Sequence, residues 1–120
     1  MVQDQAQTPA RIDVVPAASV PLASYELPAG DTIAGQPEAR NLTVLADDRV
    51  SVGIFENAPG TVRTNGVEEV FYVLEGHASI ELDTGHVIEV GPGDLGRVPR
   101  GHTALWTFLS TFRIVYVLAA

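Results

Sequence analysis

The sequence predicts an all-β protein built as one small antiparallel β-barrel or jelly roll, and three observations favour this fold class. Short apolar runs rich in β-branched and aromatic residues follow one another from Asn41 onward, with no convincing helical window between them. Gly, Pro, Asn and Asp turn residues separate these runs at the spacing typical of sandwiches and barrels. A chain of 120 residues also suits a single compact domain and leaves no room for two.

Residues 1–20 are predicted to be an N-terminal arm, because prolines interrupt this segment before any regular structure can form. Such an arm is either disordered or lies as an edge strand on a neighbouring subunit. The stretch 28–37 is rich in Pro and Gly, but the chain before it is too short to hold its own core. We therefore expect the barrel domain to span residues 21–120.

Eight to ten strands are expected in all, and seven apolar runs can be delimited as strands. They are residues 49–56, 67–75, 77–83, 86–90, 95–98, 103–109 and 111–118. In the third run Ala78, Ile80 and Leu82 share one face and polar residues share the other, which is the period of a half-buried strand. Residues 83–85 (DTG) then supply a hairpin turn. The lumen of a small barrel is the one place where this architecture offers room for a ligand.

Charge and composition exclude several classes of function. Fifteen acidic residues against seven basic ones give a formal charge of −8, so no basic patch is available for nucleic acid. The longest apolar run, Ile114–Ala120, is far shorter than the ~20 residues of a membrane span. The first ten residues lack the pattern of a secretory signal, so we expect a soluble, cytoplasmic protein. Cysteine and lysine are absent, which excludes disulfides, thiolate nucleophiles and lysine Schiff bases.

Two segments, residues 60–76 and 93–106, resemble the paired motifs of the cupin superfamily. In EEVFYVLEG, Glu69 and Gly76 have the spacing that ends the first motif. In GPGDLGRVPRG, the glycines and Pro99 have the spacing that begins the second. The resemblance implies a cupin β-barrel, although one fold hosts many chemistries.

A narrower resemblance covers about residues 35–118. The phrases VLEG and GPGD, a Pro-x-Gly turn followed by Trp106, and Arg113-x-x-Tyr116 are similar to the branch that includes ureidoglycine aminohydrolase-type cupins. This resemblance alone suggests amidohydrolysis among the candidate reactions.

The resemblance also implies a metal held by three histidines and one glutamate, and here the sequence departs from the family. Glu69 is the only one of the four ligands that remains. Counting back from it, a three-residue gap places the first two histidine positions at Arg63 and Asn65. A four-residue gap places them at Val62 and Thr64 instead. Neither alternative supplies an imidazole.

The remaining ligand position of the family falls on Ala104. His102 is the one substitute within reach, because it has the same strand parity as Ala104. Two ligands are fewer than the three that transition-metal sites typically need. We therefore expect no bound metal and no other cofactor.

Five residues are candidates for the site around the lumen. An inward Arg63 would either clamp an anionic group of a ligand or form an ion pair with Glu69 that replaces the metal. Glu69 and His102 are the candidate acid–base residues, each with a structural or solvated alternative. Asn65 and Trp106 are the remaining candidates for contact with a ligand, and core packing is the alternative for Trp106.

Three functions remain open from the sequence. The first is a metal-free cupin that binds a small polar or anionic molecule in its lumen. The second is an isomerase, epimerase or amidohydrolase of the same fold, which works either by metal-free acid–base chemistry or with a metal held by other residues. The third is a structural or interaction module whose pocket is vestigial. A homodimer is expected in each case, because exposed strand edges need covering.

Overall fold

The computed structural model describes residues 9–120, and eleven strands in this part of the chain form two antiparallel sheets. Six strands form sheet A, which in spatial order contains β1 (Ala23–Tyr25), β3 (Ala39–Ala46), β4 (Val50–Asn57), β11 (Phe112–Ala119), β6 (Glu68–Glu75) and β9 (Leu95–Val98). Five described strands form sheet B, which contains β2 (Thr32–Gly35), β5 (Gly60–Asn65), β10 (Thr103–Phe108), β7 (Ala78–Leu82) and β8 (Val87–Val90).

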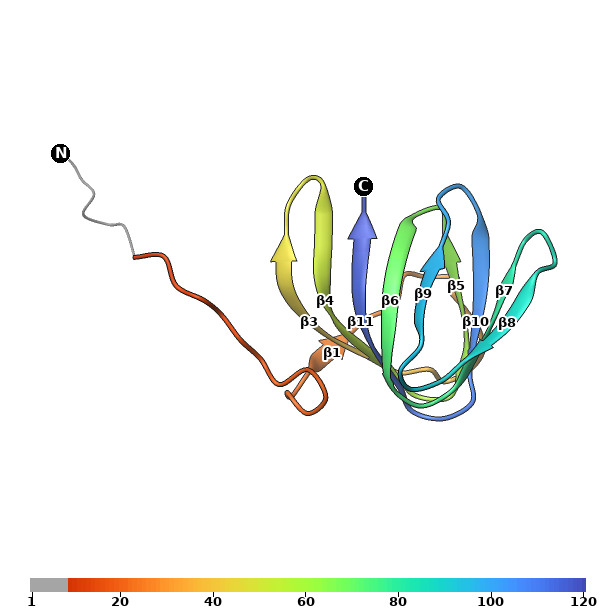
Figure 1. Ribbon diagram of the computed structural model, residues 1–120. Coiled ribbons are helices and arrows are strands. Elements are labelled where there is room, and N and C mark those ends of the chain that lie inside the picture. Colours follow the sequence, from red (N-terminus) through yellow and green to blue (C-terminus); the bar gives the residue numbers. More distant parts are fainter. Residues whose placement is uncertain (1–8) are drawn as a thin grey trace.

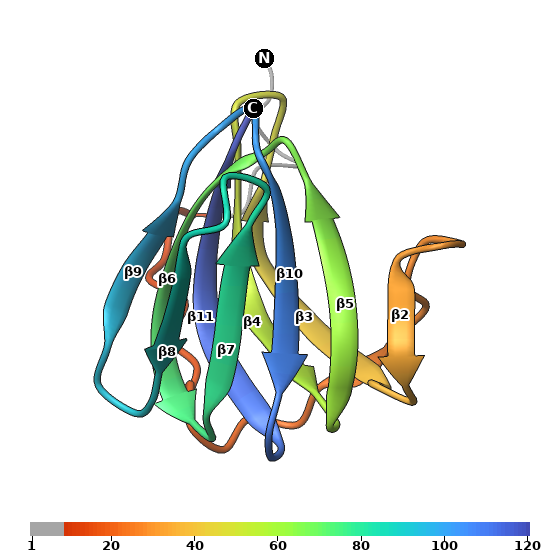
Figure 2. The ribbon, with the colours of Figure 1, turned by 90° about the vertical axis from the view of Figure 1, so that its right-hand side faces the viewer.

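The two sheets face each other and curve into a barrel (Figures 1 and 2). Figure 2 shows β8, β7, β10 and β5 of sheet B in front of the strands of sheet A. The predicted fold class, an all-β jelly-roll barrel in one domain, is confirmed. Among the described residues there is no helix with the length and apolar character needed to cross a membrane.

The core lies between the sheets and joins them through aromatic side chains. Phe71 of sheet A and Trp106 of sheet B meet edge to face, with ring centroids 5.0 Å apart. Phe108 of sheet B stacks on Phe112 of sheet A at 5.4 Å. Such pairs stabilise a core by about 0.5–1.5 kcal/mol beyond the burial of their area. They hold the inner faces of the two sheets at a fixed separation.

The seven predicted strand runs correspond to β4 and to β6 through β11, with ends that differ by at most one residue. Four further strands, β1, β2, β3 and β5, were not delimited from the sequence. Val62 is the only large apolar residue in β5, so that strand carries almost no periodic signal. It is extended because it pairs with β10 on one side and β2 on the other. Tertiary pairing overrides a weak local preference here.

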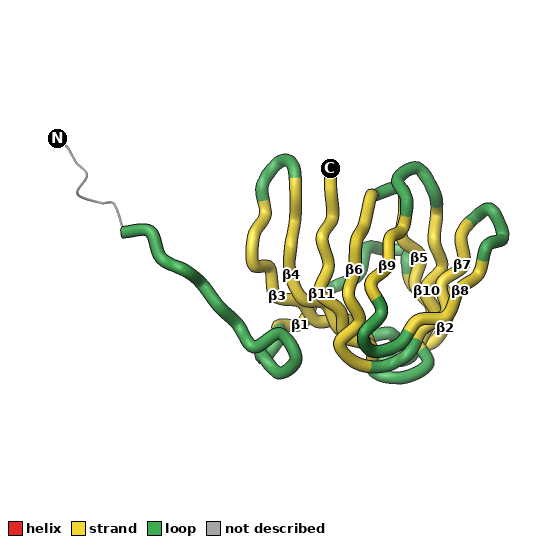
Figure 3. The backbone as a smooth tube through the Cα atoms, in the orientation of Figure 1, coloured by secondary structure: helices red, strands yellow, loops and turns green. Residues whose placement is uncertain are grey.

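The N-terminal arm contains no strand from residue 9 to the start of β1. The arm contains a turn in which the carbonyl of Pro16 accepts hydrogen bonds from the backbone N–H groups of Ser19 and Val20. Before this turn the chain runs away from the barrel (Figures 1 and 3), and Ile12 and Val14 are 89% and 83% exposed. The first eight residues of the predicted arm lie outside the described part of the chain.

Candidate functional site

A cavity of about 510 Å³ lies between the inner faces of the two sheets, and we call it the lumen. Its wall combines side chains of β3, β4, β6 and β11 from sheet A with side chains of β5 and β10 from sheet B. The connection between β1 and β2 completes the wall through Leu27, Pro28 and Asp31. This volume suits a small molecule of the kind that protein pockets commonly hold.

The register of β5 decides which of its side chains point into the lumen. Val62 pairs with Trp106 of β10, and Thr64 pairs with Ala104. Cross-strand partners share a face, and Val62, Ala104 and Trp106 are all buried in the core. The indole N–H of Trp106 donates a hydrogen bond to the hydroxyl of Thr64 at 3.3 Å. Of the two gaps left open by the sequence, the four-residue gap is therefore the one that the fold adopts.

The register of β5 does not place Arg63 on the inward face that the three-residue gap would require. Arg63 pairs with Leu105, which in turn pairs with the exposed Glu81, so these three residues share the outer face of sheet B. Asn65 has the same parity as Arg63 and is exposed. Both residues still contribute atoms to the wall of the lumen. No salt bridge within residues 9–120 joins Arg63 to Glu69, so the predicted ion pair is not formed.

Glu69 does point into the lumen. It lies on β6, is 8% exposed, and pairs with Leu118 on one side and Val98 on the other. Its carboxyl has no hydrogen-bond or salt-bridge partner among the described residues. Burial disfavours the ionised form and raises the pKa of Glu69 to about 7. The neighbouring Glu68 faces outward, as strand alternation requires.

Glu68 shows how strongly the face of a strand decides the state of a carboxyl. Its side chain accepts hydrogen bonds from the guanidinium of Arg97 and from the backbone N–H of Arg100. These two hydrogen bonds, the first being the larger cause, lower the pKa of Glu68. Two adjacent carboxyls therefore have pKa values shifted in opposite directions, and the inward one is protonated more readily.

His102 does not contribute to the wall of the lumen, so the structure does not bring it together with Glu69. Its Nδ1 lies 2.8 Å from an oxygen of the Asp83 carboxylate. The other oxygen of Asp83 accepts a hydrogen bond from the backbone N–H of Thr103. These contacts, with the Thr103 bond the larger cause, lower the pKa of Asp83. His102 is thus held by Asp83 immediately before β10 and is half-buried.

Trp106 is one of six aromatic residues in the wall of the lumen. Trp106 is 3% exposed, contributes to the wall and also packs against the core rings, and its contact with a ligand stays a prediction. On the sheet A side, the rings of Tyr25, Phe55 and Tyr116 form a chain of edge-to-face contacts with centroids 5.4 and 6.2 Å apart. The lumen is therefore lined mainly by apolar and aromatic surface.

Several polar residues of the wall were missed from the sequence. Asn41 and Thr43 come from β3, which was not delimited, and Ser51 and Asn57 come from β4. The hydroxyl of Tyr116 donates a hydrogen bond to the side-chain oxygen of Asn41 at 3.2 Å. The run at residues 49–56 was delimited as a strand, but the sequence did not indicate which of its faces would meet the other sheet.

The residues at the four family ligand positions do not fit a bound metal. These positions are Val62, Thr64, Glu69 and Ala104, which offer two hydrocarbon side chains, one hydroxyl and one carboxyl. A single anionic oxygen ligand is too few for a divalent transition metal. No group of three or more His, Cys, Asp or Glu side chains anywhere in the described chain could hold a metal ion.

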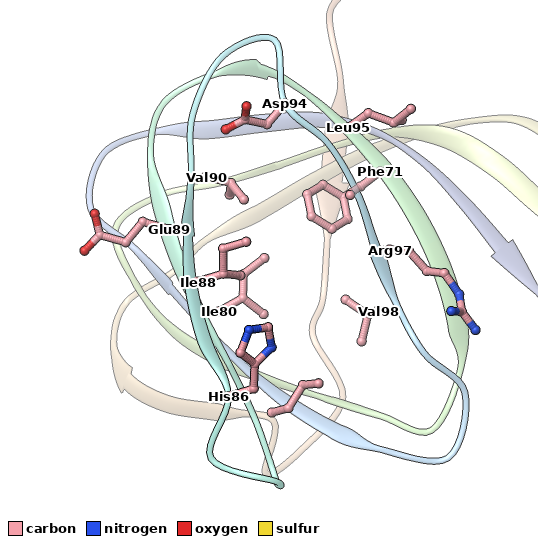
Figure 4. Close-up of a pocket in the computed structure, with 12 residues that line it drawn as sticks. Phe71, Ile80, His86, Ile88, Glu89, Val90, Asp94, Leu95, Arg97 and Val98 are labelled. Atoms are coloured by element: carbon pink, nitrogen blue, oxygen red, sulfur yellow. The ribbon is translucent and has the colours of Figure 1, made fainter.

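A second cavity, of about 300 Å³, lies between the edge strands β8 and β9 (Figure 4). Phe71, Ile80 and Ile88 point toward its centre, whereas Glu89 and Arg97 point away from it. It contains no buried polar group that a ligand could satisfy. The lumen is therefore the stronger candidate for chemistry.

Comparison with known proteins gives one family match. The family model described as the EutQ-like cupin domain matches residues 44–116. None of the curated proteins matches the sequence.

Solved structures of similar fold support this match. The EutQ protein of Clostridium difficile is 21% identical with a TM-score of 0.62, over 69% of this chain and 63% of that one. A DUF861-family protein from Pseudomonas syringae pathovar tomato is 20% identical with a TM-score of 0.75, over 85% of this chain and 46% of that one. A cupin superfamily protein of Desulfitobacterium hafniense is 20% identical with a TM-score of 0.62, over 72% and 82%. The chain thus spans less than two thirds of the first two proteins.

Proposed function

We propose that this chain, which belongs to the EutQ-like cupin domain family, binds a small molecule in the lumen of its barrel. The observation that carries the proposal is the carboxyl of Glu69, which is buried, faces a cavity of about 510 Å³ and has no partner among the described residues. A buried polar group without a partner costs about 1–3 kcal/mol. A ligand that supplies the missing hydrogen bond or charge recovers this free energy, and the aromatic wall adds apolar contact.

Catalysis in the lumen is the second candidate, and the raised pKa of Glu69 supports it. A carboxyl with a pKa of about 7 suits general acid–base work near neutral pH, as in an isomerase or epimerase. Amidohydrolysis is suggested only by the resemblance to the ureidoglycine aminohydrolase-type branch. The pairing of Glu69 with His102 is not supported, because His102 lies outside the lumen. A stoichiometric transition metal in the purified protein, removed with loss of activity, would overturn a metal-free mechanism.

A screen of small molecules by two readouts tests the proposal. Trp106 is the only tryptophan of the chain and lies in the wall of the lumen, so a bound ligand is expected to change its fluorescence. The same ligand is expected to raise the melting temperature, because it binds only the folded state. Glu69→Gln should weaken binding, whereas Glu68→Gln, which alters the outward carboxyl next to it, should not.

Two outcomes would count against a lumen site. If no compound changes either readout, the third candidate, a structural or interaction module with a vestigial pocket, replaces the proposal. If Arg63→Ala abolishes binding while Glu69→Gln leaves it unchanged, Glu69 is not the group that holds the ligand, and the observation that carries the proposal is overturned.

A further inference from the structure

The lumen contains one buried charged group, and it is acidic. Glu69 is the ionisable side chain that the fold turns inward, whereas the register turns Arg63 to the outer face. Asp31, at the connection between β1 and β2, is the other acidic residue of the wall. Arg113 is the other buried charged residue within residues 9–120, but its guanidinium is engaged by Glu56 and by two backbone carbonyls. Arg63 also contributes to the wall, but it is only half-buried, so Glu69 is the charged residue of the wall with the least access to water.

We infer that the lumen selects an organic cation, a protonated amine or quaternary ammonium group carried on an apolar body, with Glu69 as its counter-ion. This inference rests on the proposed function, because it names the class of molecule that the lumen binds. It reverses the expectation of an anionic ligand, which depended on an inward Arg63.

The aromatic wall supports the same class of ligand. Six aromatic residues contribute to it, which are Tyr25, Phe55, Trp106, Phe108, Phe112 and Tyr116. The faces of aromatic rings attract cations, and the attraction is largest where water is excluded. An apolar body gains free energy from burial against the same rings. A metal ion has no apolar body to bury against the rings, and the single inward carboxyl offers it too few ligands.

The protonation of Glu69 predicts whether the affinity for a charged ligand rises or falls with pH. A bound cation favours the ionised carboxyl and so lowers its pKa below the value of about 7 that burial produces. The affinity for a cation must then rise with pH across this range, and the affinity for an anion must fall. The strand partners of Glu69, Val98 and Leu118, carry no charge, and no histidine lies in the described wall to confuse the titration.

Three probes of equal size and different charge test the inference. They are benzylamine, which is protonated at neutral pH, benzyl alcohol and benzoate. Their affinities are measured at pH 6, 7 and 8 by titration calorimetry, with the fluorescence of Trp106 as a report from inside the lumen. We expect benzylamine to bind at least about tenfold more tightly than benzyl alcohol at pH 8. We also expect about a tenfold rise for benzylamine between pH 6 and 8, the change in the ionised fraction of a group with a pKa near 7.

Variants of adjacent carboxyls complete the experiment. Glu69→Gln should abolish both the preference for benzylamine and its dependence on pH, whereas Glu68→Gln should keep both. The inference is overturned if benzoate binds most tightly, if the affinity for benzylamine does not change with pH, or if Glu69→Gln keeps the preference. The probe series on the unaltered protein decides the question even if a variant does not fold.

Different results would contradict this inference and the proposed function. If benzyl alcohol, or a compound from the wider screen, changes the fluorescence of Trp106 while benzylamine is not preferred, the lumen binds a ligand and the inference of a cation is wrong. If no compound changes that fluorescence, the proposed function fails and the inference fails with it.

Discussion

Glu68 and Glu69 have the same side chain and differ only in the face of β6 to which they belong. The outward Glu68 is held ionised by Arg97, and the inward Glu69 is deprived of water without a compensating partner. At the scale of single residues, strand parity thus decides which carboxyl is available for function. The same parity on β5 places Val62 and Thr64 inward where Arg63 was a candidate.

The stability of the protein should depend on the protonation of Glu69. Folding raises its pKa from the ordinary 4.5 to about 7, so between these pH values the folded chain holds a proton that the unfolded chain has released. The free energy of unfolding should therefore fall as the pH rises from about 4.5 to 7, with a total change of order 3 kcal/mol. Above pH 7 the titration of Glu69 should cause no further change. Urea unfolding of the unaltered protein and of Glu69→Gln between pH 4.5 and 8 measures this difference.

The matched control is Glu68→Gln. In the unaltered protein, folding lowers the pKa of the Glu68 carboxyl, so the stabilisation by Glu68 is lost only under more acidic conditions. Between pH 5 and 7 the curve of Glu68→Gln should run parallel to that of the unaltered protein. Parallel curves for Glu69→Gln as well would contradict the burial of an ionisable Glu69.

At the scale of elements, a side chain of β11 holds the arm against the barrel. Arg113, at its start, is 7% exposed and donates hydrogen bonds to Glu56 of β4 at 2.8 Å and to the carbonyl of Ala17 at 3.0 Å. Another of its N–H groups donates to the carbonyl of Val20. A single buried guanidinium thus ties the turn of the arm to the middle of sheet A.

Replacement of Arg113 should free the arm and destabilise the barrel. Arg113→Met leaves the partly buried carboxylate of Glu56 and two carbonyls without their donor, so we expect a loss of about 3 kcal/mol in the free energy of unfolding. Limited proteolysis followed by mass spectrometry should show faster cleavage between residues 9 and 22. Arg97→Met, which removes an exposed pair with Glu68, is the control and should change neither readout appreciably. Equal effects of the two variants would contradict this assignment.

At the scale of the whole molecule, the homodimer and the cytoplasmic location stay predictions. The arm carries Ile12 and Val14 away from the barrel with their side chains exposed, although alternation with Arg11 and Asp13 suits a strand that packs on one face. Among the described strands, β8 and β9 each have an unpaired edge, and Leu95 on β9 is 73% exposed. Both features would be covered by a second copy of the chain.

Light scattering tests the homodimer. We expect a mass of about twice 12.8 kDa at micromolar concentration. The double variant Ile12→Asp/Val14→Asp should dissociate into monomers, whereas Val44→Asp, at another exposed apolar position, should not. A monomeric mass for the unaltered protein would reject the prediction.

Local pattern was sufficient for the fold class and for seven of the strands. Alternation and turn residues are properties of neighbouring positions, so they can be read without knowing what each strand pairs with. Glu69 and Trp106 were found because their motif spacing is also local. β3 and β5 were missed because their extended form comes from pairing with distant strands.

By itself, the sequence determined an all-β cupin barrel that lacks the family's imidazole ligands. Only the tertiary structure decided what replaces them, because a difference of one residue in the gap before Glu69 moves a guanidinium from the lumen to the outer face. The structure also separated His102 from Glu69, because His102 is not part of the wall of the lumen. The charge of the lumen, and hence the class of ligand that it favours, depends on a cross-strand register that no local pattern specifies.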